Sequence, residues 1–379
     1  MTGLAAVLPA GGKSRRMGRF KPLLPLGDGC VLERAVRTFR DAGLARIVVV
    51  TGNRAEEVAA KAREAGAEVA HNPDHELGMF TSIQAGVRRL GEDNADHFFI
   101  LPADTPLVRP ETVRLLAETQ QEGDFLLTCP TFLGQRGHPP LLHRDLRRAI
   151  LEHDGTDGLR GVLDTLEAGQ PDRVRELAVA DSGILLDLDR PADYAAALDS
   201  ADHGYPSAEE CQALWEMYET PEPVRGHCRA VAEAARRMVL AMNQNLPEDG
   251  RLNLDLAVSA ALAHDLCKGR PRHAKAGAEA LQRHGFPAAA DIVAVHPDLE
   301  MAPGADLTER EIVFLADKYV QGQGLVPLEA RYQAKLDKYG ADPEARLAIQ
   351  GRLTRAQIVR DRMEQRIGTP LEDLLEVKP

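Results

Sequence analysis

The spacing of apolar residues divides the chain into two halves. In the first half, short apolar runs alternate with longer segments in which apolar residues recur every three to four positions, as strands and helices in turn would require. The apolar runs predict strands at residues 4–8, 46–50, 67–70, 97–101 and 124–129. The periodic segments predict helices at residues 32–42, 55–65, 81–90 and 111–118. Such alternation predicts right-handed crossovers and a mainly parallel, Rossmann-like α/β sheet.

The second half is predicted to be all-α. The alternation stops near residues 188–200, and a turn-rich stretch at 203–207 follows. Beyond it, helical periodicity covers residues 208–218, 227–242, 254–266, 274–284 and 308–320. Because 379 residues exceed one ordinary core, two domains are expected. We predict domains at 1–202 and 203–327, with a C-terminal helical tail at 328–379 that packs on the second domain or mediates association.

Composition and charge narrow the class of protein. Hydrophobic residues make up 44% and charged residues 27%, which is typical of globular proteins. The formal net charge of −12 argues against a nucleic-acid partner, because no broad cationic surface would attract a phosphate backbone. The five cysteines form no Cys-x-x-Cys pair and predict reduced thiols. With no basic leader and no apolar run near the ~20 residues of a membrane span, we expect a cytoplasmic protein without a membrane partner.

A glycine-rich segment at residues 10–21 follows the first predicted strand. Such a turn brings backbone N–H groups close to phosphate oxygens, and Arg16 and Lys21 supply positive charge. A Walker loop is not complete, because Val7 stands where its first glycine is required. The alternative is a surface turn with scattered basic residues. We favour a triphosphate site formed by Ala10, Gly11, Gly12, Ser14, Arg16 and Lys21.

The same segment resembles the nucleotide-binding loop of the molybdenum cofactor nucleotidyltransferase family, A-G-G-x-S-x-R-M-G-x-x-K, at every fixed position. The resemblance implies catalytic roles for Arg16, Lys21 and Asp104. Asp104 follows a predicted strand and resembles the family's strand-end aspartate, and its hard oxygen ligands suit Mg²⁺. The alternative is that Asp104 or Thr105 caps a helix.

Further segments extend this resemblance over residues 1–200. In D-x-D-x-P-x-D, Asp187 is the candidate for a second Mg²⁺ ligand, whereas Asp189 and Asp193 are expected to cap the helix that begins at Pro191. The G-M-x-x-S element places Gly78 and Ser82 among the nucleotide-binding residues. The G-x-x-G-H-P element places Gly137 and His138 next to the pterin substrate.

These last two elements are similar to the cytidylyltransferase branch, which implies transfer of CMP from CTP to molybdopterin with release of pyrophosphate. Contact with molybdoenzymes or their chaperones is a further expectation. The sequence Ala10-Gly11-Gly12 is closer to the guanylyl branch, so another NTP is an alternative. A sugar-phosphate acceptor is a second alternative.

The helical half resembles the HD phosphohydrolase superfamily, whose four ligands follow the order H…HD…D. His227, His264, Asp265 and Asp317 occur in this order, and residues 263–269 match A-H-D-x-x-K-G. Imidazole and carboxylate ligands together suit Mn²⁺, Fe²⁺, Zn²⁺ or Mg²⁺. The resemblance therefore implies a metal-dependent phosphohydrolase, with a non-catalytic regulatory domain as the alternative.

Two further histidines, His273 and His296, lie where extended members of this superfamily bind a second metal. His284 and Asp298 lie close by in the sequence and are competing ligand candidates. Lys268 either meets a substrate phosphate or belongs to a solvated basic loop. The sequence leaves the substrate of this half open.

Overall fold

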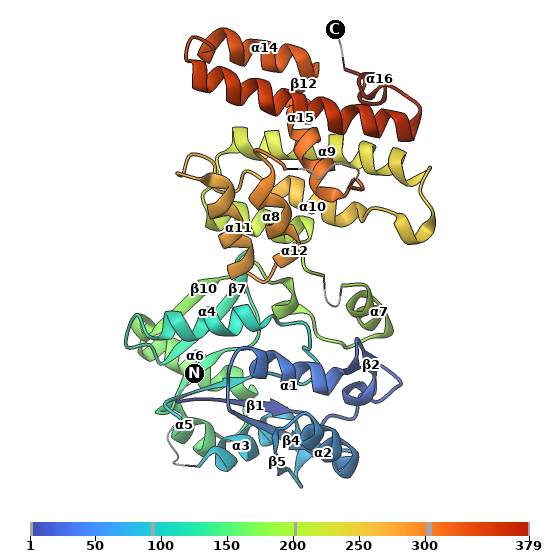
Figure 1. Ribbon diagram of the computed structural model, residues 1–379. Helices are drawn as coiled ribbons and strands as arrows, with labels where there is room; N and C mark the ends of the chain where they lie inside the picture. Colours follow the sequence, from blue (N-terminus) through green and yellow to red (C-terminus); the bar gives the residue numbers. More distant parts are fainter. Residues whose placement is uncertain (1–2, 92–94, 201–202, 301–304, 378–379) are drawn as a thin grey trace. The chain divides into compact units, whose positions relative to one another are not determined.

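The computed structural model describes residues 3–91, 95–200, 203–300 and 305–377. The chain divides into two compact units, Met1–His203 (unit 1) and Gly204–Pro379 (unit 2) (Figure 1). The first carries the sheet and the second is helical, as the change in apolar spacing predicts.

Unit 1 is built on one mainly parallel sheet, in the order β10-β7-β9-β6-β1-β4-β5 with β8 paired to β7. Its strands are β1 (Leu4–Pro9), β4 (Arg46–Thr51), β5 (Glu68–His71), β6 (His97–Ile100), β7 (Leu127–Phe132), β8 (Gln135–Arg136), β9 (Leu141–His143) and β10 (Val174–Ala178). β1 pairs in parallel with β4 and β6, whereas β9 runs antiparallel to β6 and β7. A separate hairpin joins β2 (Pro25–Leu26) and β3 (Gly29–Cys30).

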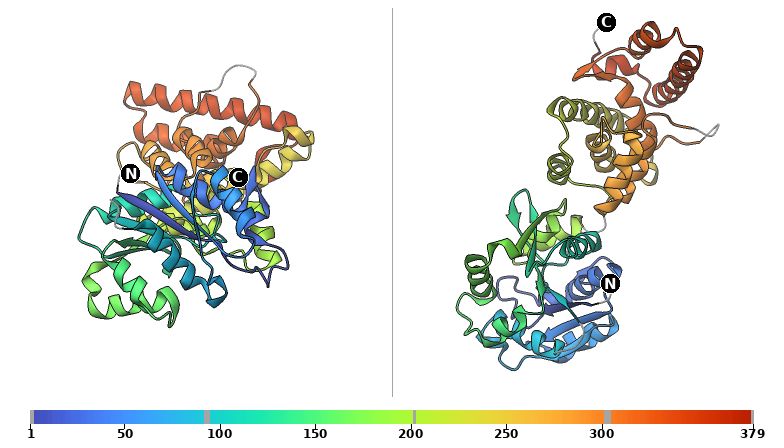
Figure 2. Two further views of the ribbon diagram at one scale, coloured as in Figure 1. Left: turned by 90° about the horizontal axis from the view of Figure 1, so that it is seen from below. Right: turned by 90° about the vertical axis from the view of Figure 1, so that its left-hand side faces the viewer.

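Helices cover both faces of this sheet (Figure 2), which explains why β1 is buried along nearly its whole length. α1 contacts α2 and α4 in one layer, and α3, α5 and α6 contact one another in the other. The helices of unit 1 are α1 (Val31–Asp41), α2 (Ala55–Glu64), α3 (Met79–Leu90), α4 (Pro110–Gln120), α5 (Leu146–Glu152), α6 (Gly158–Gly169) and α7 (Pro191–Ser200).

One predicted strand begins too early. The strand expected at 124–129 is β7, which starts at Leu127 and continues through Pro130 to Phe132. Asp124 instead lies in the preceding loop, where its carboxylate accepts a hydrogen bond from Arg173 at 2.7 Å. Asp124 is exposed, and its ion pair with Arg173 lies outside the sheet.

Unit 2 is helical apart from the short hairpin of β11 (Val320–Gln321) and β12 (Gly324–Leu325). Its helices are α8 (Ala208–Met217), α9 (Glu222–Asn243), α10 (Leu254–Ala263), α11 (His273–Arg283), α12 (Pro287–Val295), α13 (Glu309–Lys318), α14 (Leu328–Tyr339), α15 (Pro343–Ile367) and α16 (Leu371–Leu375). α9 contacts α10, α13, α15 and α16. Apolar side chains such as Met363 and Leu371 are fully buried there, so the last helices pack on the rest of unit 2.

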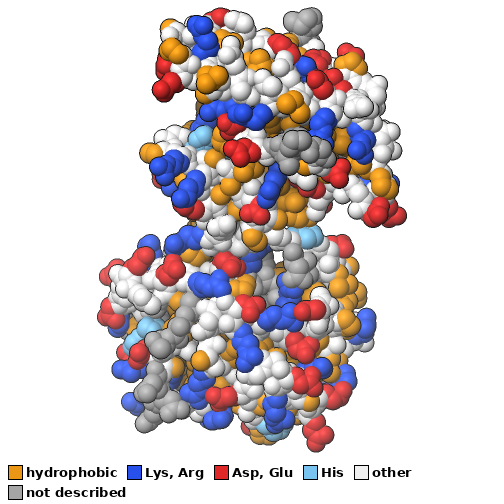
Figure 3. All heavy atoms as spheres, in the orientation of Figure 1, with side chains coloured by type: hydrophobic (Ala, Val, Ile, Leu, Met, Phe, Trp, Pro, Cys, Tyr) orange, Lys and Arg blue, Asp and Glu red, His pale blue; other side chains and the backbone are white. Residues whose placement is uncertain are grey.

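Among the described residues, no helix is both long enough and apolar enough to cross a membrane. On the face drawn in Figure 3, Lys and Arg side chains are interspersed with Asp and Glu side chains over both units. The negative net charge is therefore not gathered into one patch on that face.

Candidate functional site

The candidate site of unit 1 lies where the strand order reverses. β1 has β4 on one side and β6 on the other, so the loops after β1 and β6 diverge at their carboxyl ends. Parallel sheets bind ligands in the crevice that forms at such a point. The glycine-rich segment follows β1 and Asp104 follows β6, so the topology brings the two predicted elements together.

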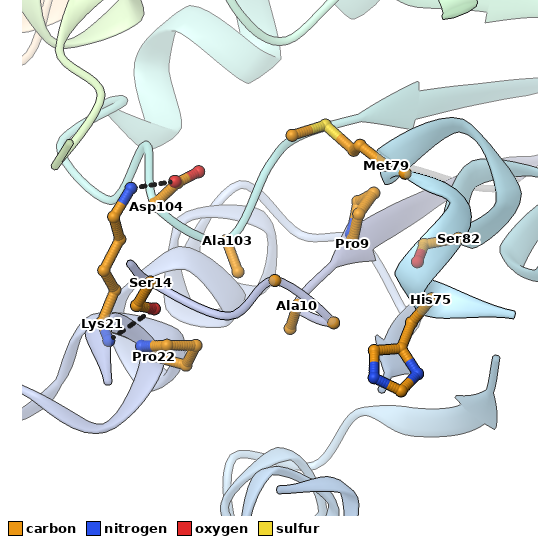
Figure 4. A pocket seen from close by; sticks show the side chains of 13 residues that line it. Pro9, Ala10, Ser14, Lys21, Pro22, His75, Met79, Ser82, Ala103 and Asp104 are labelled. Carbon is orange, nitrogen blue, oxygen red and sulfur yellow. Dashed lines mark hydrogen bonds and ion pairs between the residues drawn. The ribbon is translucent and has the colours of Figure 1, made fainter. Parts of the chain in front are cut away.

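A cavity of about 210 Å³ lies between these loops (Figure 4). It is lined by all the predicted nucleotide-binding residues except Arg16, namely Ala10, Gly11, Gly12, Ser14, Lys21, Gly78, Ser82 and Asp104. Arg16 lines an adjoining cavity of about 390 Å³, together with Lys13 and Arg15. The two cavities share Gly11, Ser14, Lys21 and His75, so they adjoin, and Lys and Arg side chains line them.

Lys21 is the buried cation of this site. Its side chain is only 9% exposed, and Nζ lies 2.9 Å from Oδ2 of Asp104 and 2.7 Å from Oδ1 of Asp189. Burial alone would lower the pKa of Lys21, but the hydrogen bonds to Asp189 and Asp104 outweigh it and raise the pKa above its usual value. Lys21 is therefore charged at neutral pH.

The loop conformation is fixed by backbone contacts. Ser14 has a positive φ of 52°, and its Oγ accepts a hydrogen bond from the Lys21 backbone N–H at 3.0 Å. Asn53 donates its backbone N–H to the carbonyl of Gly11 at 3.2 Å, which ties the loop to the segment after β4. A Cβ on Gly11 would lie 3.3 Å from Oγ of Ser82, so the glycine permits this close approach.

The first turn of α3 faces the same cavity through Gly78, Met79 and Ser82. In the described part of the chain no side chain caps this helix, so its N-terminal N–H groups and the positive end of its dipole are available to an anion. Asn72 donates hydrogen bonds to Oγ1 of Thr81 and Oγ of Ser82, at 2.8 and 2.9 Å. Asn72 has no motif around it, and its role becomes visible only in the structure.

Asp104 and Asp187 lie on two segments that pair with each other. The backbone N–H of Leu188 donates to the carbonyl of Asp104 at 2.9 Å, and Thr105 Oγ1 donates to Oδ1 of Asp187 at 2.7 Å. Asp187 is exposed and lines neither cavity. The structure thus places the two predicted Mg²⁺ ligands on adjoining segments.

The prediction that Asp189 caps the helix at Pro191 is wrong. Its carboxylate contacts Lys21 and also Nη1 of Arg16, at 2.5 Å, because the two cations of the loop attract it more strongly than a helix end. Asp193 does act as a cap, since its carboxylate accepts the backbone N–H of Arg190 at 2.7 Å.

Gly137 and His138 do not line the first cavity. His138 donates its backbone N–H to the carbonyl of Ile184 at 2.8 Å, and a Cβ on Gly137 would lie 2.4 Å from that same carbonyl. Nδ1 of His138 is buried and has no hydrogen-bond partner within the described ranges, and burial lowers the pKa of this histidine. The structure gives these residues a packing role, and their contact with a pterin stays a prediction.

In unit 2 the structure brings together all six predicted metal ligands. They come from α9 (His227), the end of α10 (His264 and Asp265), the start of α11 (His273), the end of α12 (His296) and α13 (Asp317). By contrast, His284 contacts Tyr218 and Asp298 pairs with Arg355, so neither competing candidate belongs to the cluster.

The Asp265 carboxylate is the centre of the cluster. Its Oδ2 lies 3.4 Å from Nε2 of His264 and 3.9 Å from Nε2 of His227. Its Oδ1 lies 3.3 Å from Nε2 of His273 and 3.6 Å from Nε2 of His296. Two groups of possible ligand atoms, each within 4.8 Å of one another, therefore share this one carboxylate.

Three of the imidazoles are held by backbone carbonyls through Nδ1. His264 contacts the carbonyl of Ala261 at 2.7 Å, His296 that of Val293 at 2.7 Å, and His227 that of Gly322 at 2.9 Å. Such contacts fix the ring and present Nε2 to a metal. Burial lowers the pKa of His296 to about 4, so this imidazole is neutral at pH 7.

The cluster is incomplete as a hydrogen-bonded core. Nε2 of His264 and Oδ1 of Asp265 are buried and, among the described residues, form no hydrogen bond. Buried polar atoms without partners are costly, and a divalent cation bound by imidazole and carboxylate would satisfy both. The residues present therefore fit one or two divalent metals.

Lysine and arginine side chains surround this cluster. Lys268 lies 2.8 Å from Oδ2 of Asp265, and the buried Lys318 lies 2.7 Å from Oδ2 of Asp317. Arg331 from α14 reaches Oδ1 of Asp317 at 3.4 Å. Of these, the sequence indicates only Lys268, since Lys318 and Arg331 lie outside the motif.

Comparison with known proteins gives two family matches. Residues 6–172 match the family model of the MobA-like NTP transferase domain, and residues 224–321 match that of the HD domain. A molybdenum cofactor cytidylyltransferase from Escherichia coli is 27% identical over 52% of this chain and 96% of its own length. A phosphoenolpyruvate guanylyltransferase from Rubrobacter xylanophilus is 33% identical over 44% of this chain and 76% of its own. A solved nucleotidyl transferase from Methanothermobacter covers 52% of this chain and 96% of its own, with 25% identity and a TM-score of 0.46.

Proposed function

Because the chain belongs to the MobA-like NTP transferase family over residues 6–172 and carries an HD domain over residues 224–321, we propose two linked activities. Unit 1 transfers CMP from CTP to molybdopterin and releases pyrophosphate. Unit 2 is a metal-dependent phosphohydrolase. With these roles we propose the division into residues 1–202, 203–327 and 328–379.

The observation that carries the first proposal is the buried Lys21 at the junction of the two cavities. A charged ammonium held by two carboxylates is already oriented toward the space that the glycine loop and the first turn of α3 enclose. The negative charge of a triphosphate in this space would be stabilised by Lys21, Lys13 and Arg16, and its oxygens would accept hydrogen bonds from backbone N–H groups. The base and ribose would then occupy the part lined by α3.

The carboxylates of Asp104 and Asp187 fit Mg²⁺. One oxygen of each is already engaged, by Lys21 and Thr105, while no partner of the other oxygen is found among the described residues. Hard carboxylate oxygens are the ligands that Mg²⁺ prefers. The ion would supply charge to offset the negative charge that develops on the phosphates.

In the proposed reaction, the terminal phosphate oxygen of molybdopterin forms a bond to the α-phosphorus of CTP. The bond from that phosphorus to the bridging oxygen breaks, and pyrophosphate leaves. No side-chain nucleophile is required, so the task of Lys21 and Arg16 is to orient the phosphates and stabilise their charge.

Two observations favour different nucleotide bases. Gly78 and Ser82, which favour CTP in the sequence, line the cavity. The loop sequence Ala10-Gly11-Gly12 and the likeness to a guanylyltransferase favour GTP as a second candidate. Pyrophosphate release should be measured with CTP, GTP, ATP and UTP, with molybdopterin and with sugar phosphates. Turnover with CTP and molybdopterin alone supports the proposal, whereas turnover with GTP or with a sugar phosphate contradicts it.

The second proposal depends on the six-residue cluster around Asp265. His227, His264 and Asp317 would hold one metal with Asp265, and His273 and His296 the other. The metal would lower the pKa of a bound water and so supply the nucleophile for phosphoester hydrolysis. Hydrolysis that appears after metal reconstitution and is lost in His264→Ala supports this role. Metal-loaded protein that is inactive on a phosphoester panel would favour a regulatory role instead.

A further inference from the structure

The metal cluster of unit 2 opens into a cavity of about 770 Å³, part of whose wall lies outside the HD match. The HD match ends at residue 321, whereas α14 begins at Leu328. Residues of α14 that line the cavity include Arg331, Lys335 and Lys338. The C-terminal helices are therefore part of this site.

Buried side chains of α14, next to its cationic ones, hold this helix beside the cluster. Leu328 and Tyr332 are buried, and α14 packs against α15. Arg331 donates hydrogen bonds to the backbone carbonyls of Asp317 and Val320, which fixes the start of the helix next to the metal ligand Asp317. The cationic side chains of α14 are thus positioned by the fold.

The charges along this wall are not balanced. Six Lys and Arg side chains line the cavity and only two carboxylates do, Asp265 and Asp317. Lys268, Lys318 and Arg331 pair with those carboxylates. For Lys335 and Lys338, no ion pair is found among the described residues. Burial and the neighbouring Arg331 and Lys318 lower the pKa of Lys335 to about 8, as expected for a cation without a counter-ion.

The three cations of α14 follow one another along a single helix face. Positions 331, 335 and 338 are four and three residues apart, so their side chains project to the same side. At a rise of 1.5 Å per residue, the row extends about 10 Å away from Asp317. One phosphate at the metal cluster leaves most of this row free.

We propose that Lys335 and Lys338 bind a second phosphate group, so that unit 2 takes ligands with two or more linked phosphates in preference to monophosphates. Arg331 connects this subsite to the metal cluster. The inference rests on the proposed phosphohydrolase function of unit 2 and names its substrate class.

The test is calorimetric titration of the full-length, Mn²⁺-loaded protein with inorganic tripolyphosphate and with orthophosphate. The double variant Lys335→Ala/Lys338→Ala is expected to weaken tripolyphosphate binding about tenfold or more, and orthophosphate binding much less. The single variant Lys335→Arg, which keeps the positive charge, should retain most of the wild-type affinity for tripolyphosphate. Lys275→Ala, which removes an exposed lysine of α11 outside the cavity, is the matched control and should change neither. Since the substitutions lie in unit 2, differences from the wild type report on this site whatever unit 1 binds.

Equal weakening of both ligands, or of neither, would overturn the inference. The hydrolase proposal fails separately, if wild-type protein hydrolyses no phosphoester. Tripolyphosphate binding that depends on Lys335 but occurs without hydrolysis would retain the subsite and reject the hydrolase. If the double variant changes the hydrolysis of nucleoside monophosphates and triphosphates equally, the hydrolase is retained and the subsite is rejected.

Discussion

The candidate sites of the two units differ in whether their buried polar groups have partners within the protein. In unit 1, Lys21 lies between Asp104 and Asp189, so the protein neutralises its own site. In unit 2, Nε2 of His264 and Oδ1 of Asp265 are buried and have no hydrogen-bond partner among the residues that the structure describes. In the proposed reaction, the phosphates of the nucleotide would replace these protein contacts in the first site. In the second, a bound cation would supply the partners that these atoms lack.

The two sites also differ in the elements that build them. The cavity of unit 1 is lined largely by one continuous loop and the first turn of one helix. The cluster of unit 2 takes six side chains from five helices and their ends. A substitution is therefore expected to act locally in unit 1 and on the whole cluster in unit 2.

The largest effect is expected for Asp265→Asn. Because both groups of ligands share this carboxylate, bound metal should fall to background, and phosphoester hydrolysis by about 10³-fold or more. Metal content by mass spectrometry and hydrolysis rates check this. Asp291→Asn, at an exposed aspartate of α12, is the matched control. Full metal content in Asp265→Asn would contradict a shared ligand.

In unit 1, Lys21→Met should lower the rate of pyrophosphate release by about 100- to 1,000-fold, the range for loss of one preorganised charge contact. Asp104 and Asp189 both lose their contact with the ammonium, although Asp189 keeps Arg16, so the melting temperature of unit 1 should fall as well. Lys61→Met, on the exposed face of α2, should retain activity. An active Lys21→Met would remove this lysine from the mechanism.

Addition of metal tests the central difference directly. At a metal concentration of 100 times Kd, the stability of unit 2 should rise by about 2.7 kcal/mol, whereas unit 1 without nucleotide should change much less. Scanning calorimetry with and without Mn²⁺ would show whether one transition moves or both. Equal shifts would mean that Asp104 and Asp187 bind the ion without nucleotide.

Gly137→Ala separates a packing role from a role in binding. The added Cβ would lie 2.4 Å from the carbonyl of Ile184, so we expect unit 1 to lose about 1–3 kcal/mol of unfolding free energy. Gly169→Ala, where a Cβ meets no atom within 4 Å, should cost far less. Unchanged stability with a raised KM for the acceptor would favour pterin contact.

The effect that is smallest per step of the variable concerns pH. The pKa of His296 is lowered by burial to about 4, so between pH 6.5 and 4 the unfolded chain binds a proton that folded unit 2 does not. The unfolding free energy of metal-free unit 2 should therefore decrease as the pH falls below 6.5, by up to about 1.4 kcal/mol per pH unit. Urea unfolding at several pH values should show that the unfolding free energy of His296→Asn changes less with pH than that of the wild type. An identical slope would assign the pH dependence to other groups.

Much of the fold could be predicted from the sequence, because strand and helix spacing are local signals. The central strand β1, the crossover helices and the change to helices after residue 200 all follow from apolar periodicity. The antiparallel β9 and the late start of β7 do not, since strand pairing and the Asp124–Arg173 contact join distant parts of the chain.

The sequence by itself determined which residues are candidates for the chemistry: the glycine loop with Lys21, and the four residues in HD order with His273 and His296. Only the tertiary structure decided how they are arranged. It pairs Asp189 with a lysine 168 residues away, makes Asp265 common to two ligand groups, and places α14 in the wall of the second cavity. The physical reason is that residue type and local spacing fix which groups are available, whereas the partner of a buried charge is selected by packing between elements that are distant in sequence.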